Sequence, residues 1–220
     1  MADASQRDLN LWKQELGEVP DWVWLQNHLQ TLVLADNRLT QLSGRVGRMQ
    51  GLRMLDLGHN QLTELPEELG ELTGLRDFLY LHDNRLGSLP SSLQRLTRLR
   101  YLNISQNAFE EFPECVCGMT SLIELRVSDN PLTALPEALG RLAQLRELHL
   151  RNTKVAELPD SLGMLRELRH IDLRGNPLRA LPLTLTGLPR LEKLDVRWVT
   201  TLDPPAWLDE LEERGCAVYR

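Results

Sequence analysis

Two histidines and an aspartate in the second half of the chain are the side chains best suited to chemistry. His149, His170 and Asp172 sit beside periodic apolar residues that predict adjacent strands. Two imidazoles and a carboxylate can bind zinc or exchange protons, so one alternative is a metal-dependent enzyme. Against it, the sequence contains no Gly-rich phosphate loop, nucleophile elbow or zinc motif. We therefore favour a protein that is not an enzyme and has no cofactor or metal.

Three cysteines offer a second kind of chemistry. Cys115 and Cys117 flank Val116, and the third, Cys216, lies near the end of the sequence. An odd number of cysteines is a poor disulfide framework, which favours a reducing cytoplasmic location. We interpret the thiols as unreactive, with a two-cysteine metal or redox site as the alternative. Because Val116 occupies a core position, Cys115 and Cys117 are predicted to project away from the core.

The elements that would position these side chains follow from a repeat of about 23 residues. An asparagine marks the repeat at positions 37, 60, 84, 107, 130 and 176. In each unit a Leu-x-Leu pair, such as Leu55 and Leu57, has the period of a strand, whereas Leu135, Leu139 and Leu142 have helical spacing. One unit cannot bury its own apolar face, so the units must stack. The asparagine is predicted to bind backbone groups of neighbouring coils.

These motifs resemble the leucine-rich repeat family, in particular its intracellular 23-residue class, which includes Ras-pathway scaffold proteins and bacterial proteins. The resemblance implies an α/β fold, a curved solenoid (horseshoe) with parallel strands on the concave face and helical or 3-10 segments on the convex face. Residues 1–28 are expected to form an N-terminal cap with one degenerate repeat, residues 29–198 about eight repeats, and residues 199–220 a C-terminal cap with a short helix. The five tryptophans, which concentrate near both ends, are interpreted mainly as cap packing.

Strand residues outside the apolar frame would face the concave wall and carry any specificity. The middle of the wall gathers Met54, Phe78, Tyr80, His82 and Tyr101, which are typical of an interface anchor. The interval from one asparagine to the next is 24 residues only here, so a bulge could push Phe78 outward. Alternatively, Phe78 replaces a frame leucine and Tyr80 packs on its neighbour.

Arginines dominate the C-terminal part of the same wall. Arg151, Arg174 and Arg197 recur at one position of three neighbouring units, and like charges on adjacent strands need something negative between them. One interpretation is an internal ion-pair network with nearby acidic residues, and the other is a site for an acidic or phosphorylated partner. The candidate acidic residues are Glu124, Glu147, Asp172 and Asp195. The complete set of predicted partner-binding residues is Met54, Phe78, Tyr80, His82, Tyr101, Asn103, Arg126, His149, Arg151 and Arg174.

The function implied by the resemblance is a non-enzymatic protein–protein interaction module, a scaffold or signalling component that binds another protein through its concave face. A bacterial effector that engages host signalling proteins is one variant, and a self-associating unit is another alternative. The formal net charge of −6 gives no basic footprint, so no nucleic acid is expected. The sequence has no long apolar run, so no membrane contact is expected. We expect a monomer in isolation.

Overall fold

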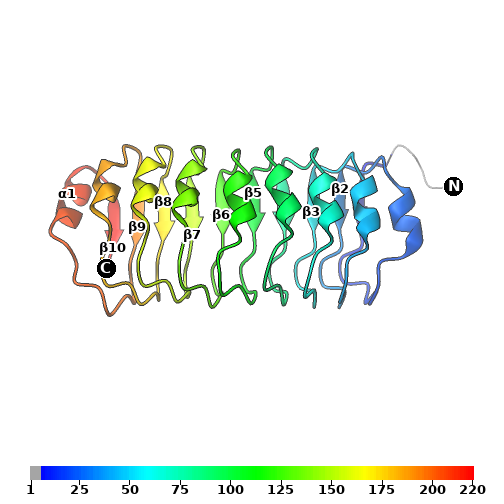
Figure 1. Ribbon diagram of the computed structural model, residues 1–220, viewed down its shortest axis with the longest axis horizontal. Coiled ribbons are helices and arrows are strands. Elements are labelled where there is room, and N and C mark those ends of the chain that lie inside the picture. The colour runs from blue at the N-terminus through cyan, green and yellow to red at the C-terminus, as the bar shows by residue number, and fades with distance from the viewer. Residues whose placement is uncertain (1–5) are drawn as a thin grey trace.

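The Leu-x-Leu pairs form short strands that join into one parallel sheet. The computed structural model describes residues 6–220, and each strand in it is three residues long. The strands pair in consecutive order from β1 to β10 (Figure 1). Their bounds are β1 Asp8–Asn10, β2 Thr31–Val33, β3 Met54–Asp56, β4 Phe78–Tyr80, β5 Tyr101–Asn103, β6 Glu124–Arg126, β7 Glu147–His149, β8 His170–Asp172, β9 Lys193–Asp195 and β10 Ala217–Tyr219.

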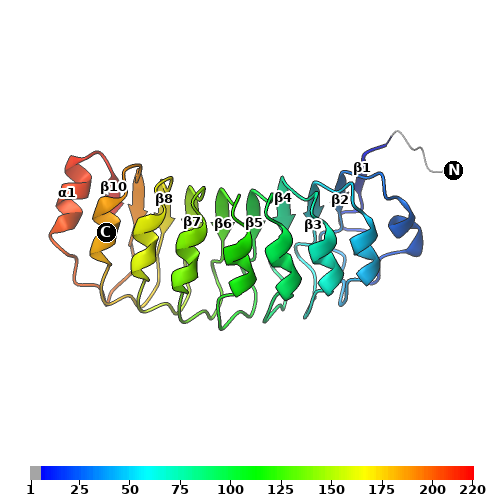
Figure 2. The ribbon, with the colours of Figure 1, turned by 45° about the horizontal axis from the view of Figure 1, so that its top comes forward.

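The helical half of each unit is a five-residue 3-10 helix on the opposite side of the coil (Figure 2). Seven of these helices begin directly after a proline, whose restricted φ suits a helix start. The bounds are η1 Asp21–Leu25, η2 Gly44–Arg48, η3 Glu67–Glu71, η4 Ser91–Arg95, η5 Glu114–Gly118, η6 Glu137–Arg141, η7 Asp160–Met164, η8 Leu183–Gly187 and the α-helix α1 Trp207–Glu213. The result is a curved solenoid with strands on the concave face, as predicted.

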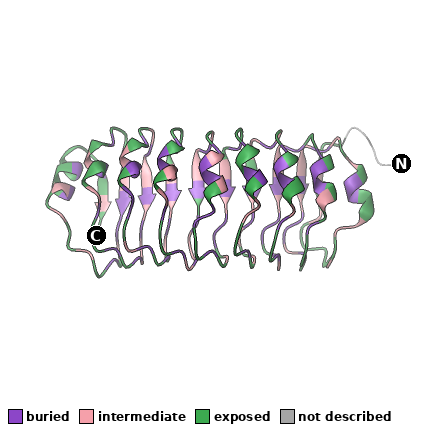
Figure 3. Cartoon of the chain, in the orientation of Figure 1, coloured by how far each residue is buried: buried purple, intermediate pink, exposed green. Residues whose placement is uncertain are grey.

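The core is a continuous column of leucines between the strands and the 3-10 helices. Leu55 and Leu57 are fully buried, as is Leu69 on the helical side. Figure 3 shows buried segments along both walls of the stack. Each fully buried leucine stabilises the fold by roughly 1.5–3 kcal/mol relative to an exposed one.

The repeated asparagines form a ladder of hydrogen bonds between coils. The Nδ2 of Asn60 donates to the carbonyls of Leu34 and Leu57, at 3.1 and 3.0 Å. Its Oδ1 accepts from the backbone N–H groups of Asn37 and Leu39, at 3.0 and 2.9 Å. The side chain therefore satisfies buried backbone groups of two coils, as predicted from its spacing.

The longer repeat has its extra residue directly before β4. Here the N–H groups of Arg76 and Asp77 both donate to the carbonyl of Arg53, and Phe78 then pairs with Met54. The Phe78 side chain is 41% exposed, while Leu79 is fully buried. The interpretation that Phe78 points outward is confirmed, and the alternative that it replaces a frame leucine is wrong.

The ends of the solenoid differ from the prediction in one respect. Helix α1 lies beside β10 and buries Leu208 and Leu211 against the last coils (Figure 1). Trp24 is also buried, but Trp12, Trp22 and Trp198 are 48–66% exposed. Cap packing therefore does not account for these three tryptophans. The division into two caps and a repeat region stays a prediction.

Within residues 6–220, no helix is long and apolar enough to cross a membrane.

The prediction that both thiols of the Cys115–Cys117 pair project away from the core is wrong. Cys117 is only 3% exposed and Cys115 is half-buried. Cys117 occupies the place that Gly70 has in an earlier coil, where a Cβ would come too close to Ser92 of the next helix. Adjacent 3-10 helices pack closely, so a side chain at this position lies against the neighbouring coil and is buried. Burial raises the pKa of both thiols to about 11, so they are poor nucleophiles at neutral pH.

Candidate functional site on the concave face

An aromatic cluster occupies the middle of the concave face. We define it as Phe78 and Tyr80 of β4, Tyr101 of β5, and His82 just after β4. The Phe78 ring stacks on Tyr80 with 5.8 Å between centroids, and Tyr101 lies 5.4 Å from Phe78 and 5.0 Å from Tyr80. His82 meets the edge of Tyr80 at 6.0 Å. The structure thus brings these predicted residues together.

Two features extend the aromatic cluster at its edges. Met54, on β3, pairs with Phe78 in the sheet. A hollow of about 260 Å³ lies beside the rings of Phe78 and Tyr101, and Ile123 also lines it. Burial raises the pKa of Tyr101 to about 12, so its hydroxyl stays protonated at physiological pH. The cluster therefore presents apolar ring surface together with neutral hydroxyl groups.

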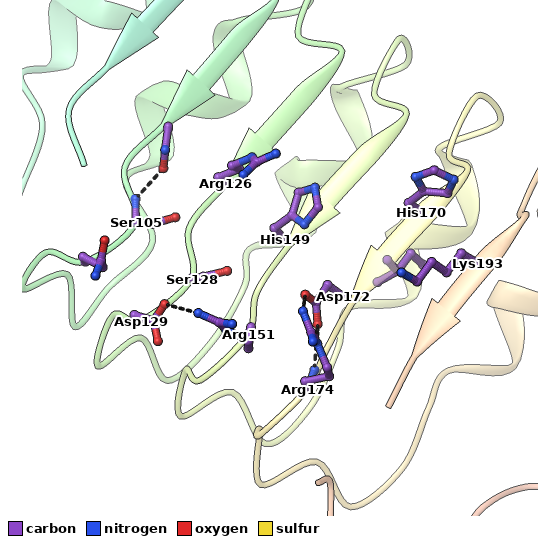
Figure 4. A pocket seen from close by; sticks show the side chains of 13 residues that line it. Ser105, Arg126, Ser128, Asp129, His149, Arg151, His170, Asp172, Arg174 and Lys193 are labelled. Atoms are coloured by element: carbon purple, nitrogen blue, oxygen red, sulfur yellow. Dashed lines mark hydrogen bonds and ion pairs between the residues drawn. The ribbon is translucent and has the colours of Figure 1, made fainter. Parts of the chain in front are cut away.

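A basic hollow of about 430 Å³ adjoins the aromatic cluster toward the C-terminus (Figure 4). We define it by the positively charged and imidazole side chains among its lining residues, which are Arg126, His149, Arg151, His170, Arg174 and Lys193. The acidic lining residues are Asp129 and Asp172, so the cations outnumber the anions in a chain of net charge −6. Arg126 also joins the two surfaces, since its Cζ lies 5.8 Å from the Tyr101 ring centroid.

Much of the charge at the C-terminal end is paired internally. Arg174 donates to Asp172 from two nitrogens, at 2.8 and 2.5 Å, and its Nε also lies 3.6 Å from Asp195. Arg197 binds Asp195 at 2.7 Å. Burial opposes ionisation of Asp195, which is 1% exposed, but the hydrogen bonds from Arg197 outweigh it and lower the pKa. The predicted ion-pair network is therefore present around Arg174 and Arg197.

The middle of the basic hollow is less tightly paired. Arg151 reaches one carboxylate oxygen, Oδ2 of Asp129, at 3.2 Å. Lys193 lies over the Tyr219 ring, with Nζ 5.3 Å from its centroid. Asn103 uses its side-chain oxygen to accept the N–H of Ser105. Cationic groups here retain donors that can face an anionic ligand.

The alternative metal site of His149, His170 and Asp172 is not supported by the geometry, because the three side chains are not brought together. Asp172 is held by Arg174, while the Nε2 of His149 lies 3.3 Å from Glu147 and 3.7 Å from Glu124. His170 lies 3.8 Å from Glu147. Among residues 6–220, the three with ligand atoms within 4.8 Å of one another are instead Glu124, Glu147 and His149. Arg126 already binds the Glu124 carboxylate at 2.5 Å, which supplies a positive charge without an ion.

Sequence reasoning missed a polar cluster at the rim of the concave face, just after strands β3 and β4 end. The Nδ1 of His59 lies 2.6 Å from Asp83 Oδ2, and its Nε2 lies 3.2 Å from His82 Nε2. His59 and Asp83 each directly precede a ladder asparagine, at Asn60 and Asn84. Aligning the units through those asparagines would have placed the two side chains on adjacent coils.

Family comparisons agree with this architecture. A model described as "Leucine rich repeat" matches residues 27–86 and 77–132, and one described as "Leucine-rich repeat region" matches residues 134–213. No curated protein matches the chain significantly.

Several solved structures have a similar fold. A leucine-rich repeat protein of Leptospira interrogans is 26% identical with a TM-score of 0.59, and the match covers 99% of this chain and 67% of that one. The leucine-rich repeat domain of the type III effector XopL is 25% identical with a TM-score of 0.76, covering 98% and 77%. The plant peptide hormone receptor RGFR1, solved in complex with RGF2, is 29% identical with a TM-score of 0.73, covering 82% of this chain and 30% of the receptor.

Proposed function

This chain belongs to the leucine-rich repeat family, and we propose from that premise that it binds a protein or peptide partner through its concave face. The observation that carries the proposal is the aromatic cluster, exposed next to a basic hollow on the same sheet face. The fold is an interaction scaffold, and the peptide hormone receptor RGFR1 was solved in complex with RGF2. Family and surface chemistry thus point to the same function.

The aromatic cluster is the proposed anchor. Phe78 is 41% exposed, and the tyrosine rings beside it are held by mutual contacts. Rigid aromatic side chains bury large areas at little cost in conformational entropy, and tyrosine is enriched among residues that dominate binding energy. A partner segment that covers these rings would displace water from a preformed surface.

The basic hollow is the proposed selectivity region. Arg126 and Arg151 keep donors that face the hollow, and bidentate or charge-assisted hydrogen bonds favour carboxylates and phosphates. We infer that the partner segment carries negative charge on the side that enters the hollow. The acidic net charge of the rest of the chain would repel such a partner elsewhere, which orients it.

Affinity capture from lysate of the source cell tests the proposal. The bait is compared with the triple variant Tyr80→Ala, Tyr101→Ala, Arg126→Ala, and bound proteins are identified by mass spectrometry. The matched control is Arg48→Ala, Gln94→Ala, Arg141→Ala, since these exposed residues lie in η2, η4 and η6 on the convex side. Circular dichroism checks that both variants fold. We expect a protein captured by wild type and control but not by the concave-face variant.

Equal capture by wild type and the concave-face variant would contradict the proposal that the concave face binds the partner. Capture lost only in the convex control would move the site to the helical side. Direct binding of the purified partner, measured by calorimetry with the same three proteins, then separates direct contact from contact through a larger complex.

A second candidate is an effector delivered into a host cell. The observation that favours it is the match to the XopL leucine-rich repeat domain, which covers 98% of this chain. A reporter fused to the full chain and expressed in a bacterium that carries a secretion apparatus for effectors would appear inside cultured host cells only if that apparatus is intact. Signal that persists without the apparatus, or none with it, contradicts this candidate.

A further inference from the structure

Two histidines on neighbouring coils point their Nε2 atoms toward each other at the rim of the concave face, just after strands β3 and β4 end. The Nε2 atoms of His59 and His82 are 3.2 Å apart, and the ring centroids are 4.7 Å apart at an interplanar angle of 79°. The backbone ties the two coils together here, because the N–H of His59 donates to the carbonyl of His82 at 3.0 Å. The juxtaposition is thus set by the repeat.

A carboxylate fixes the tautomer of His59. Its Nδ1 lies 2.6 Å from Oδ2 of Asp83, so the proton of a neutral imidazole resides on Nδ1 and the Nε2 lone pair is free. A carboxylate that accepts the second ring N–H is the usual outer partner of a metal-binding histidine. Asp83 therefore prepares His59 for coordination through Nε2.

The His82 ring is held in place by its packing. A Cβ added to Gly58 would lie 2.5 Å from Cε1 of His82, so the ring occupies the space that the missing side chain of Gly58 leaves. The Nδ1 of His82 is buried with no hydrogen-bond partner among the described residues. Burial, and then the neighbouring His59, lower the pKa of His82, which keeps the imidazole neutral near pH 7.

We propose that His59 and His82 bind a zinc ion through their Nε2 atoms, with Asp83 orienting His59. Two nitrogen ligands about 2.0–2.1 Å from zinc at a tetrahedral angle lie roughly 3.3–3.4 Å apart, close to the observed 3.2 Å. A hollow of about 410 Å³ lies beside His59 and Asp83, and Asp36, Arg38 and Trp12 also line it. Water completes the coordination in the isolated protein.

The competing explanation is a simple hydrogen bond between the two imidazoles. In that case His82 donates its Nε2–H to His59 and zinc has no effect on either ring. The site is also distinct from the group of Glu124, Glu147 and His149, which lies on β6 and β7. Substitutions at each location therefore separate the three possibilities.

Calorimetric titration of the full chain with zinc chloride, after removal of any affinity tag, tests the proposal. Histidine side-chain NMR signals report which rings respond. We expect one saturable site, with His59 and His82 shifting on the Nε2 side. His59→Gln and His82→Gln should abolish it, and Asp83→Asn should weaken it roughly 10–100-fold. His28→Gln and His149→Gln are the matched controls and should leave it unchanged.

Two results would overturn the proposal. One is the absence of saturable zinc binding by the folded wild-type chain. The other is zinc binding that His149→Gln removes and His82→Gln does not. Circular dichroism of each variant excludes unfolding as the cause, and the large exposure of His59 makes its substitution safe for the fold.

Discussion

The two halves of the concave face share one backbone and carry opposite chemistry. On β4 and β5 the outward side chains form an aromatic cluster, and from β6 to β9 they form arginine–carboxylate pairs around a basic hollow. Both halves have three-residue strands in continuous parallel register. The buried frame and the asparagine ladder hold the coil, so the outward positions are free to differ. Surface chemistry in this solenoid is therefore independent of the repeat.

The halves also differ in how far their outward side chains already have partners within the chain. Phe78 leaves two fifths of its surface exposed, whereas Arg174 and Arg197 share the nearly fully buried Asp195. Exposed ring surface can only be covered by another molecule. A paired guanidinium, by contrast, already has hydrogen-bond acceptors and an opposite charge within the chain. We expect the aromatic half to contribute more binding energy and the charged half to contribute selectivity.

The largest expected effect contrasts ladder and surface asparagines. Asn60→Ala should lower the free energy of unfolding by about 3 kcal/mol, because it leaves buried N–H and C=O groups of two coils without partners. Asn103→Ala, on the concave face, should cost less than about 0.5 kcal/mol. Urea denaturation followed by circular dichroism measures both. Equal losses would mean that the surface is also part of the frame.

The next effect compares binding by the two halves. Tyr80→Ala with Tyr101→Ala should weaken binding of the captured partner about 30-fold, which corresponds to about 2 kcal/mol, with little dependence on salt. Arg151→Ala should cost about fivefold, and its effect should disappear as ionic strength rises from about 0.05 to about 0.5 M. Calorimetry at both salt concentrations is the measurement. A salt-sensitive loss for the tyrosine variant would contradict the division of roles.

A gain in stability is expected where the ladder is interrupted. Thr153 takes the asparagine position, and its hydroxyl donates to Asn176. An amide can reach more backbone groups than one hydroxyl, so Thr153→Asn should raise the free energy of unfolding by about 1 kcal/mol. Thr153→Ala is the control and should lower it. Destabilisation by asparagine, measured by the same denaturation assay, would show that this coil has a different geometry.

The smallest effects concern pH and separate the halves again. Burial and His59 lower the pKa of His82, so the unfolded chain binds this proton at pH values where the folded chain does not. The free energy of unfolding should fall as the pH drops below about 6.5, by at most about 1.4 kcal/mol per pH unit. His82→Gln should remove this slope, and an unchanged slope would contradict the assignment.

In the C-terminal half of the concave face, Asp195 should give the free energy of unfolding a separate dependence on pH. Burial opposes its charge, but hydrogen bonds from Arg197 lower the pKa overall, so its stabilisation is complete above the unfolded value of about 3.9. That contribution is lost only as the pH falls from there through the lowered folded pKa. Denaturation of wild type and Asp195→Asn between about pH 2 and about pH 6 should converge at the acid end. A constant difference would argue against this titration.

The sequence by itself determined the solenoid, the parallel strands and the role of the ladder asparagines. Those follow from spacing, since Leu55 and Leu57 can share a buried face only in a strand and Asn60 recurs where buried backbone groups need partners. It also located the aromatic cluster, because Phe78, Tyr80 and Tyr101 occupy outward positions of consecutive units.

Only the tertiary structure decided which polar groups meet. Asp172 could serve a metal or an arginine, and the choice depends on the reach of Arg174, which spacing does not reveal. Cys117 is buried because adjacent 3-10 helices pack closely, and His59 meets His82 because the His82 ring fills the space left by the missing side chain of Gly58. Contacts between coils depend on side-chain rotamers and ångström-scale distances, whereas the coil itself depends only on the period.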